Sequence, residues 1–549
     1  MDPITFEVIR SALYAIADEM KVILSRSARS PLLQEAGDLS CALTDPEGRL
    51  VAQGDDMPIH LGVMAFTVKE LLRRVDRATM KPGDFYLTNA LDVGGNHLPD
   101  MKGIAPIFVH GHLVAFAETL AHWADIGGMI PGSYSARATE IYQEGLQIPP
   151  VKVIEGGKVR HEVVDLIMTN VRGREQRFGD LMAQYAATQY ADRRVRAIVE
   201  AYGRDTVGAA MAESFDYSER RMRHAIRTIP EGVYRAEDFM DDDGASGKPF
   251  RIVVEVTVRD GEITYDFTGT DAQAAGPINT TYFGTCSAAF CATRNLTDPS
   301  IPANEGCYRP IRVIAPEGTI LNVRHPGPVV AGNHETSERV IDAIVLALAS
   351  AIPAQVTAAC FGSAFISILA GRDRRRASPF TFYEIGPGGY GARPHRDGTN
   401  GTRARIGNTK NTPAEVVEKA YPVRVVEYGF VPDSGGAGKF RGGLGVRRAY
   451  RVLEPATASL MGERCRFRPY GLFGGEEGRA GEVRILATDG RVRQTLRGKE
   501  VAELETGEVL VVESAGGGGY GNPAERSPAA READVLDGYV TAVPRDATS

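Results

Sequence analysis

The sequence predicts a mixed α+β protein made of several parts, with antiparallel hairpins, a helical middle and a glycine-rich, β-dominated C-terminal part. Three observations predict this class. Apolar residues alternate on both sides of two short turns, at 45–48 and 259–261. Residues 165–228 contain no proline, and the first one after them is Pro230. Glycines are dense between residues 384 and 445, and strand-like segments follow them.

The first predicted element is a helix over 2–30. Asp2 can cap it, Pro3 suits its first turn, and Phe6, Ile9 and Leu13 begin an apolar stripe at alternating spacings of three and four. We expect this stripe to pack on a core or on a partner helix. The next element is a hairpin over 38–52, in which alternating residues flank an Asp-Pro-Glu-Gly turn.

The remaining elements are predicted from the helical and strand periodicities of apolar residues and from the glycines and prolines that separate them. They are a helix over 61–75, strands over 104–109 and 113–120, helices within 165–228, a hairpin of 251–258 and 262–268, a helix over 337–351, and strands over 421–431, 444–453, 481–488 and 508–513. We divide the chain into an N-terminal α+β part (1–160), a helical segment (161–235), a mixed α/β core (236–415), a β-rich part (416–525) and a loose tail (526–549).

Composition excludes several classes of protein. The 549 residues correspond to about three to four domain-sized units. With 63 Lys and Arg against 70 Asp and Glu, the formal charge is −7, so we expect no nucleic-acid partner. The six cysteines form no CxxC pair, which is typical of free thiols in a reducing compartment. The most apolar segment, 343–352, is too short to span a bilayer, and no signal peptide is evident. We therefore expect a cytoplasmic protein without a membrane partner.

The strongest chemical pattern lies between residues 89 and 128. If the turn between the two strands centres on Gly111, opposed residues have numbers that add up to 222, which places Asp100 opposite His122. His97 lies one Leu-Pro step before Asp100 and can reach the same point. Two imidazoles and one carboxylate suit a divalent transition metal with positions left open for water or substrate. A His-x-x-Asp pair that only forms a hydrogen-bonded turn is the alternative.

Three further polar residues are candidates at this site. Asp125 has three open interpretations: a ligand, a partner that orients an imidazole, or a cap for the following segment. Asp38 and His60 lie at the ends of predicted elements, where either a functional or a structural role fits.

Phosphate-binding and nucleophile motifs are weaker. Gly244–Lys248 is followed by Pro249 and does not match a Walker loop. The 435–443 segment predicts either an anion cradle or a glycine-rich turn, and 516–519 predicts a tight loop. Cys307 has a structural interpretation, because neither His325 nor His334 has a spacing that favours it as a base. We therefore predict that the chain has no nucleotide site of its own.

Ten short motifs run in one order along residues 3–525. They are Asp38-Leu-Ser-Cys41-Ala, Pro58-Ile-His60-Leu-Gly, His97-Leu-Pro-Asp100, Ala121-His122-Trp-Ala-Asp125-Ile-Gly-Gly, Asp266-Phe-Thr-Gly-Thr, Asn304-Glu-Gly-Cys307, the glycine-rich run Glu384–Gly391, Asn408-Thr-Lys-Asn-Thr-Pro413-Ala-Glu415, Asp433-Ser-Gly-Gly-Ala-Gly438 and Arg441-Gly-Gly-Leu-Gly445. In this order the chain resembles the hydantoinase B/5-oxoprolinase family, which includes the corresponding subunits of acetone and acetophenone carboxylases and of caprolactamase.

The resemblance implies a site and a partner. His97, Asp100 and His122 match the family's metal ligands, and Asp38 is our candidate for a further ligand or close neighbour. The metal would be Zn, Mn or Fe. The family's usual partner is a hydantoinase A-type subunit that binds ATP on an actin-like fold, so ATP would act through that partner, in a hetero-oligomer.

The implied activity is that of a metal-dependent subunit of an ATP-dependent cyclic amide hydrolase of the hydantoinase, 5-oxoprolinase or lactamase type. The partner phosphorylates the amide oxygen, and water activated by the metal attacks the carbon and opens the ring. Asp125 or His60 would act as the general base. Trp123 stands where family members often carry a second histidine, and Asn89-Ala-Leu replaces the usual Asn-Asp-Pro.

Three alternatives remain. The chain could belong to an ATP-dependent ketone carboxylase. It could be a non-haem iron oxygenase, although such sites usually have His-x-Asp on one strand. It could also be a non-catalytic scaffold subunit with a structural metal.

Overall fold

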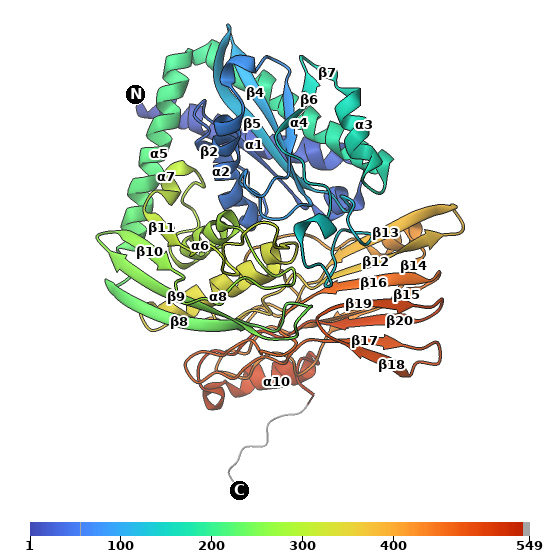
Figure 1. The fold of residues 1–549 in the computed structure, drawn as a ribbon. Coiled ribbons are helices and arrows are strands. Elements are labelled where there is room, and N and C mark those ends of the chain that lie inside the picture. Colours follow the sequence, from blue (N-terminus) through green and yellow to red (C-terminus); the bar gives the residue numbers. More distant parts are fainter. Residues whose placement is uncertain (55, 542–549) are drawn as a thin grey trace.

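The computed structural model describes residues 1–54 and 56–541. Their strands form four sheets with helices packed on them, which confirms the predicted mixed α+β class (Figure 1). Among these residues, each helix is either too short or too polar to cross a bilayer.

The N-terminal sheet carries both of the hairpins predicted there. Its strands lie in the order β2-β1-β5-β4-β3-β6-β7. Their bounds are β1 Leu39–Thr44, β2 Leu50–Gln53, β3 Phe85–Thr88, β4 Asp100–Val109, β5 His112–His122, β6 Val151–Glu155 and β7 Lys158–Val159. The β4–β5 hairpin is longer than predicted because only two residues turn the chain, His110 (φ 49°) and Gly111 (φ 79°), and this geometry suits the twist of the flanking strands.

Helices cover this sheet and bury the predicted apolar stripe. They are α1 Pro3–Ser27, α2 Pro58–Arg74, α3 His161–Thr169, α4 Arg174–Tyr202 and α5 Arg204–Ile226. The carboxylate of Asp2 accepts hydrogen bonds from the amides of Ile4 and Thr5, which confirms the predicted cap. Ile9, Leu13, Ile16 and Met20 are buried, and α1 packs against α4 and β1. The stripe therefore belongs to the core of this chain.

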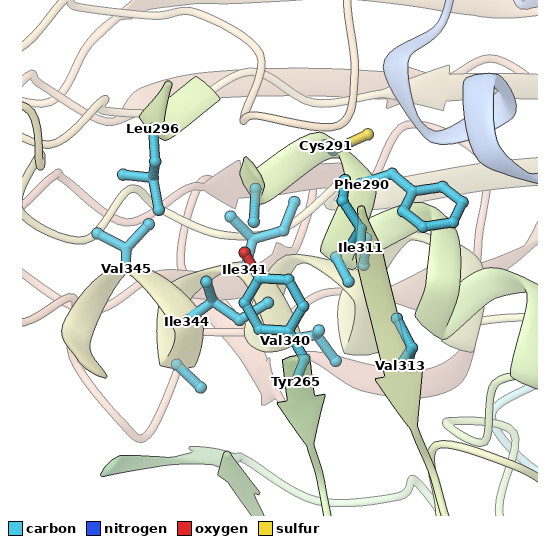
Figure 2. Packing of buried hydrophobic residues seen from close by; sticks show 14 of the residues in the cluster. Tyr265, Phe290, Cys291, Leu296, Ile311, Val313, Val340, Ile341, Ile344 and Val345 are labelled. Carbon is cyan, nitrogen blue, oxygen red and sulfur yellow. The ribbon is translucent and has the colours of Figure 1, made fainter. Parts of the chain in front are cut away.

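A second, four-stranded sheet has the order β11-β10-β9-β8. It consists of β8 Gly232–Met240, β9 Phe250–Arg259, β10 Glu262–Asp266 and β11 Ile311–Ile314, and it lies beside α6 Tyr282–Leu296, α7 Glu305–Tyr308 and α8 Ser337–Leu348. Figure 2 shows Tyr265 of β10 close to Val340 and Ile344 of α8, and Ile311 of β11 beside Phe290 of α6. Helix α8 is buried nearly all round, against both the sheet and α6, and its charged residues Glu338, Arg339 and Asp342 are buried with it.

The two C-terminal sheets pack face to face. One has the order β13-β12-β16-β19 and the other β14-β15-β20-β17-β18. Their bounds are β12 Ile366–Asp373, β13 Ser378–Ile385, β14 Val423–Phe430, β15 Val446–Val452, β16 Ala456–Met461, β17 Glu482–Leu486, β18 Val492–Leu496, β19 Lys499–Leu504 and β20 Val509–Glu513, with α9 Ala414–Ala420 beside β14. Strand β12 pairs with β13 on one side and with β16 on the other, so a sheet crosses the predicted boundary at 415.

The glycine-rich segments pack backbone against backbone. The predicted tight loop at 516–519 is wrong: the amides of Gly517, Gly518 and Gly519 donate to carbonyls of three other segments. A Cβ at Gly517 would lie 2.1 Å from the Tyr390 carbonyl oxygen, so only glycine fits. The amides of Gly436, Gly442 and Gly443 also donate to carbonyls, which makes 435–443 a structural segment rather than an anion cradle.

Part of the expected loose tail is ordered. Residues Pro528–Leu536 form helix α10, where Asp534 is buried and pairs with Arg441 and Arg526. The prediction is therefore wrong for this helix, because Arg441 of the glycine-rich part pairs with Asp534, and Arg526 links Asp534 to Asp397 of the same part. The last part of the predicted tail, 542–549, lies outside the described residues.

Candidate metal centre

The β4–β5 hairpin brings the three predicted ligands together. Asp100 pairs with His122 at the open end of the hairpin, as predicted. The same register holds as far as Ile107 and Ala115, after which a bulge shifts it by one residue next to the turn. The predicted register is therefore confirmed at the site, although the turn itself departs from it by one residue.

One carboxylate oxygen lies between the two imidazoles. Asp100 Oδ1 is 2.9 Å from His97 Nε2 and 3.0 Å from His122 Nδ1. All three side chains are buried, and one potential ligand atom of each lies within 4.8 Å of the others. Two donor atoms held at right angles about 2.1 Å from one ion lie about 3.0 Å apart, so these spacings fit a shared divalent cation.

The protonation of His97 fits the same interpretation. His97 Nδ1 lies 3.1 Å from the Val330 carbonyl oxygen, which can only accept, so Nδ1 carries the proton and Nε2 presents a lone pair to Asp100. The Val330 segment is itself fixed, because Glu144 accepts hydrogen bonds from the amides of Val329 and Val330. A lone pair directed at a carboxylate requires a cation between them, either a proton or a metal ion.

The second oxygen of Asp100 is held from another side. Asn96 Nδ2 donates to Asp100 Oδ2 over 2.7 Å, and His60 Nε2 lies 3.5 Å from the same oxygen. Burial by itself would raise the pKa of Asp100, but the nearby imidazoles of His97 and His60 outweigh it and hold that pKa well below its usual value. The carboxylate is therefore anionic, as a metal ligand must be.

Asp38 and His60 lie at the site, as the sequence suggested. Asp38 Oδ2 is 4.0 Å from His122 Nδ1, and its backbone carbonyl accepts a hydrogen bond from the His122 amide. His60 Nδ1 is 2.8 Å from Ser40 Oγ, which aims the opposite edge of the ring at Asp100.

Asp125 has other partners. Its carboxylate accepts hydrogen bonds from the amides of Gly127 and Gly132 and from both the amide and the guanidinium of Arg172. Four fixed donors surround this carboxylate, so the arrangement does not support the prediction that Asp125 is the general base. It instead holds together the loop that follows His122.

The structure adds residues that the sequence analysis missed. His334 and Glu335 lie in a short π-helical turn, Gly332–Thr336, immediately before α8. The His334 ring stacks on Tyr134 at 5.6 Å between centroids and lies 6.3 Å from the His97 ring. Tyr383 packs 5.2 Å from the His122 ring. A polar Asn-His-Glu-Thr run immediately before the predicted helix over 337–351 was the available signal.

His334 is poised as a neutral base. Its Nδ1 is 2.9 Å from Glu335 Oε1, and its Nε2 is buried and has no hydrogen-bond partner within residues 1–54 and 56–541. Burial lowers the pKa of His334 well below its usual value. Burial also raises the pKa of Glu335, to about 7. The unpartnered nitrogen can therefore accept a proton from a group that enters the site.

Known proteins resemble this chain over almost its whole length. The sequence model of Hydantoinase B/oxoprolinase matches residues 2–523. A protein of a Pseudomonas species (strain NS671) that is named as a D-/L-hydantoinase component is 33% identical, with 98% of this chain and 93% of that protein covered.

Two solved structures share the fold. The ATP-dependent caprolactamase from Pseudomonas jessenii superposes with a TM-score of 0.92 at 32% identity and covers 98% of this chain and 94% of its own. An acetone carboxylase in its nucleotide-free form superposes with a TM-score of 0.91 at 19% identity, over 98% of this chain and 78% of that one. The chain therefore belongs to the hydantoinase B/oxoprolinase family.

Proposed function

We propose that this chain is the metal-dependent subunit of an ATP-dependent cyclic amide hydrolase. The observation that carries the proposal is the placement of Asp100 Oδ1 at 2.9 and 3.0 Å from two imidazole nitrogens in a buried site. Similarity to a hydantoinase component and to caprolactamase supports the substrate class.

The proposed ligands are His97, Asp100 and His122, with Asp38 as the close neighbour. When bound there, a divalent ion of Zn, Mn or Fe supplies Lewis acidity that makes hydroxide available near neutral pH. Asn96 and His60 position the Asp100 carboxylate through its second oxygen. His60 is therefore proposed as a positioning residue rather than as the base.

His334 is the proposed general base. Its Nε2 accepts a proton from the attacking water while Nδ1 stays bonded to Glu335. Water adds to the carbon of the phosphorylated amide, and both of its protons end on the nitrogen: one passes through His334, and the other leaves the new hydroxyl group as the carbon–nitrogen bond breaks. The acyl phosphate that results then loses phosphate to a second water. Burial of the site keeps bulk water away from these steps.

The proposed partner is a hydantoinase A-type subunit that binds ATP. An unstrained amide is a poor electrophile, and phosphorylation of its oxygen removes much of the barrier that the metal would otherwise have to overcome. The glycine-rich segment 435–443, the best candidate phosphate loop in the sequence, uses several of its amides in internal hydrogen bonds. This supports phosphorylation by another subunit.

The test is to co-express the chain with its A-type partner and assay the complex. We expect ring opening of a lactam, 5-oxoproline or a hydantoin that requires ATP. His122→Ala should abolish turnover, whereas His112→Ala, an exposed histidine at the other end of β5, should not.

The assay also separates the alternatives. Consumption of a ketone with bicarbonate, without ring opening in the panel, would replace the hydrolase proposal with the carboxylase. Oxygen uptake that depends on Fe(II) and ignores ATP would replace it with the oxygenase. Full turnover by His122→Ala would overturn the catalytic role of the centre and leave the scaffold interpretation.

A further inference from the structure

A cavity of about 610 Å³ borders the candidate metal centre. The start of α4, the segment 30–32 before β1 and residues 378–383 of β13 line it. Tyr383 belongs to both sites, because it lines the cavity and its ring also packs 5.2 Å from that of His122. Tyr383 therefore connects the cavity with the candidate metal centre, whereas the proposed ligands themselves are not among the lining residues.

The cavity wall is rich in arginine. Its charged lining residues are Arg172, Arg174, Arg177 and Arg376 together with Asp125, Glu175 and Asp373. Each arginine also has an acidic partner: Asp125 for Arg172, Asp165 for Arg174, Asp180 for Arg177 and Asp373 for Arg376. The N-terminus of α4 also points here without a side-chain cap, since its N-cap is Gly173. Helix N-termini and guanidinium groups both favour anions.

Two buried polar groups in this wall have no hydrogen-bond partner in the described part of the chain. They are Ser30 Oγ and Arg177 Nε, and the two residues are 1% and 2% exposed. Asp180 fixes both residues, because its Oδ1 accepts from the Ser30 amide over 3.0 Å and its Oδ2 lies 3.3 Å from Arg177 Nη2. Buried donors without a hydrogen-bond partner are rare in folded proteins, so the Ser30 hydroxyl and the Arg177 Nε–H group favour a ligand that accepts hydrogen bonds.

We propose that this cavity binds the phosphoryl group of a small phosphorylated organic molecule, through Ser30, Arg177 and the N-terminus of α4. Oxygen acceptors of a phosphoryl group match these donors. Phe380 and Phe382 line the same cavity and suit an apolar organic part. The inference rests on the proposed function in one respect, because a phosphorylated cyclic amide is such a molecule and must reach the neighbouring metal centre.

The test is a binding titration of the full chain with phenyl phosphate, followed by calorimetry and ³¹P NMR. We expect one saturable site, with weaker binding of inorganic phosphate and of benzoate. Ser30→Ala should weaken phenyl phosphate binding about tenfold, because it removes one hydrogen bond to a charged group. The Ser30 hydroxyl has no hydrogen-bond partner among the described residues, so the thermal unfolding of this variant should match that of the wild type. Ser11→Ala, an exposed serine on α1, is the matched control.

Arg177→Lys provides a second variant. It keeps a cation beside Asp180 but removes the guanidinium Nε, so we expect weaker binding without loss of the fold. Absence of saturable phenyl phosphate binding, or wild-type affinity in both Ser30→Ala and Arg177→Lys, would overturn the proposal.

One further variant separates this inference from the proposed function. His122→Ala should lose metal but retain phenyl phosphate binding that depends on Ser30. If binding is lost in His122→Ala and unchanged in Ser30→Ala, the anion binds at the metal centre and this cavity is not the site. If the wild-type chain binds phenyl phosphate through Ser30 but holds no metal, the cavity proposal stands and the proposed function fails.

Discussion

Replacement of Asn96 by alanine should loosen the metal centre while leaving its three ligands in place. Asn96 is fully buried, and its Nδ2 donates to Asp100 Oδ2 over 2.7 Å and to Asn333 Oδ1 over 2.8 Å. Its Oδ1 accepts from the His97 amide over 3.0 Å. One bond to a carboxylate, at about 1.5–3 kcal/mol, and two neutral bonds, at about 1 kcal/mol each, predict a loss of about 3–5 kcal/mol in the free energy of unfolding.

The same change should weaken metal binding by about 10- to 100-fold, as is usual when a residue that orients a ligand is removed. The assay is a chelator competition titration with Zn²⁺ or Mn²⁺, run beside urea unfolding of the metal-free chain. Asn170→Ala serves as the control, because Asn170 is an exposed residue at the end of α3. Unchanged metal affinity in Asn96→Ala would refute the argument that the second oxygen of Asp100 must be held.

The structure makes three further predictions. Burial raises the pKa of Glu144 from 4.5 to about 8, so between these pH values the folded chain keeps a proton that the unfolded chain loses, and the free energy of unfolding should fall by about 1.4 kcal/mol per pH unit. In urea unfolding from pH 5 to 8, the free energy of unfolding of Glu144→Gln should therefore fall less steeply than that of the wild type, and equal slopes would contradict this prediction. Gly517→Ala should lower the free energy of unfolding by more than about 4 kcal/mol, because there is no space for its Cβ, whereas Gly208→Ala, at an exposed position of α5, should stabilise the chain slightly. Similar thermal unfolding temperatures for the two variants would be incompatible with this packing. His334→Gln should lower the kcat of the complex with the A-type partner by about 10²- to 10⁴-fold without loss of metal. Replacement of the exposed His325 by Gln is the control, and an undiminished kcat in His334→Gln would remove His334 from the mechanism.

The sequence alone was sufficient to place together the proposed ligands that one hairpin supplies. Counting from a turn centred on Gly111 placed Asp100 opposite His122. The turn itself pairs Val109 with His112, one residue away from this count, and the bulge next to Ile107 restores the predicted register towards the site. Helix α1 was predictable for a similar reason, since its cap and its stripe are local signals.

Residues that reach the centre from distant segments could not be found in this way. Tyr134, His334 and Tyr383 are separated by long stretches of chain, and only tertiary packing brings their rings to His97 and His122. Trp123 has a structural explanation, since its ring is buried and its Nε1 donates to Gln184 of α4 over 3.3 Å.

The glycine-rich segments were misjudged for a different reason. Glycines such as Gly516 to Gly518 usually mark turns, and the interpretation of 516–519 as a loop followed that rule. In this chain they permit extended backbones to approach one another closely, and the partners of each segment lie far away in sequence. Composition alone does not distinguish these two uses of glycine.

The central claim is that His97, Asp100 and His122 hold one divalent transition metal ion. The most direct measurement is the metal content of the purified full-length chain by elemental mass spectrometry, compared with His122→Ala and with His112→Ala. We expect about one ion per wild-type and His112→Ala chain and almost none in a folded His122→Ala chain. A metal-free wild-type chain that also fails to bind Zn²⁺, Mn²⁺ or Fe²⁺ on titration, or equal metal content in all three, would contradict the claim.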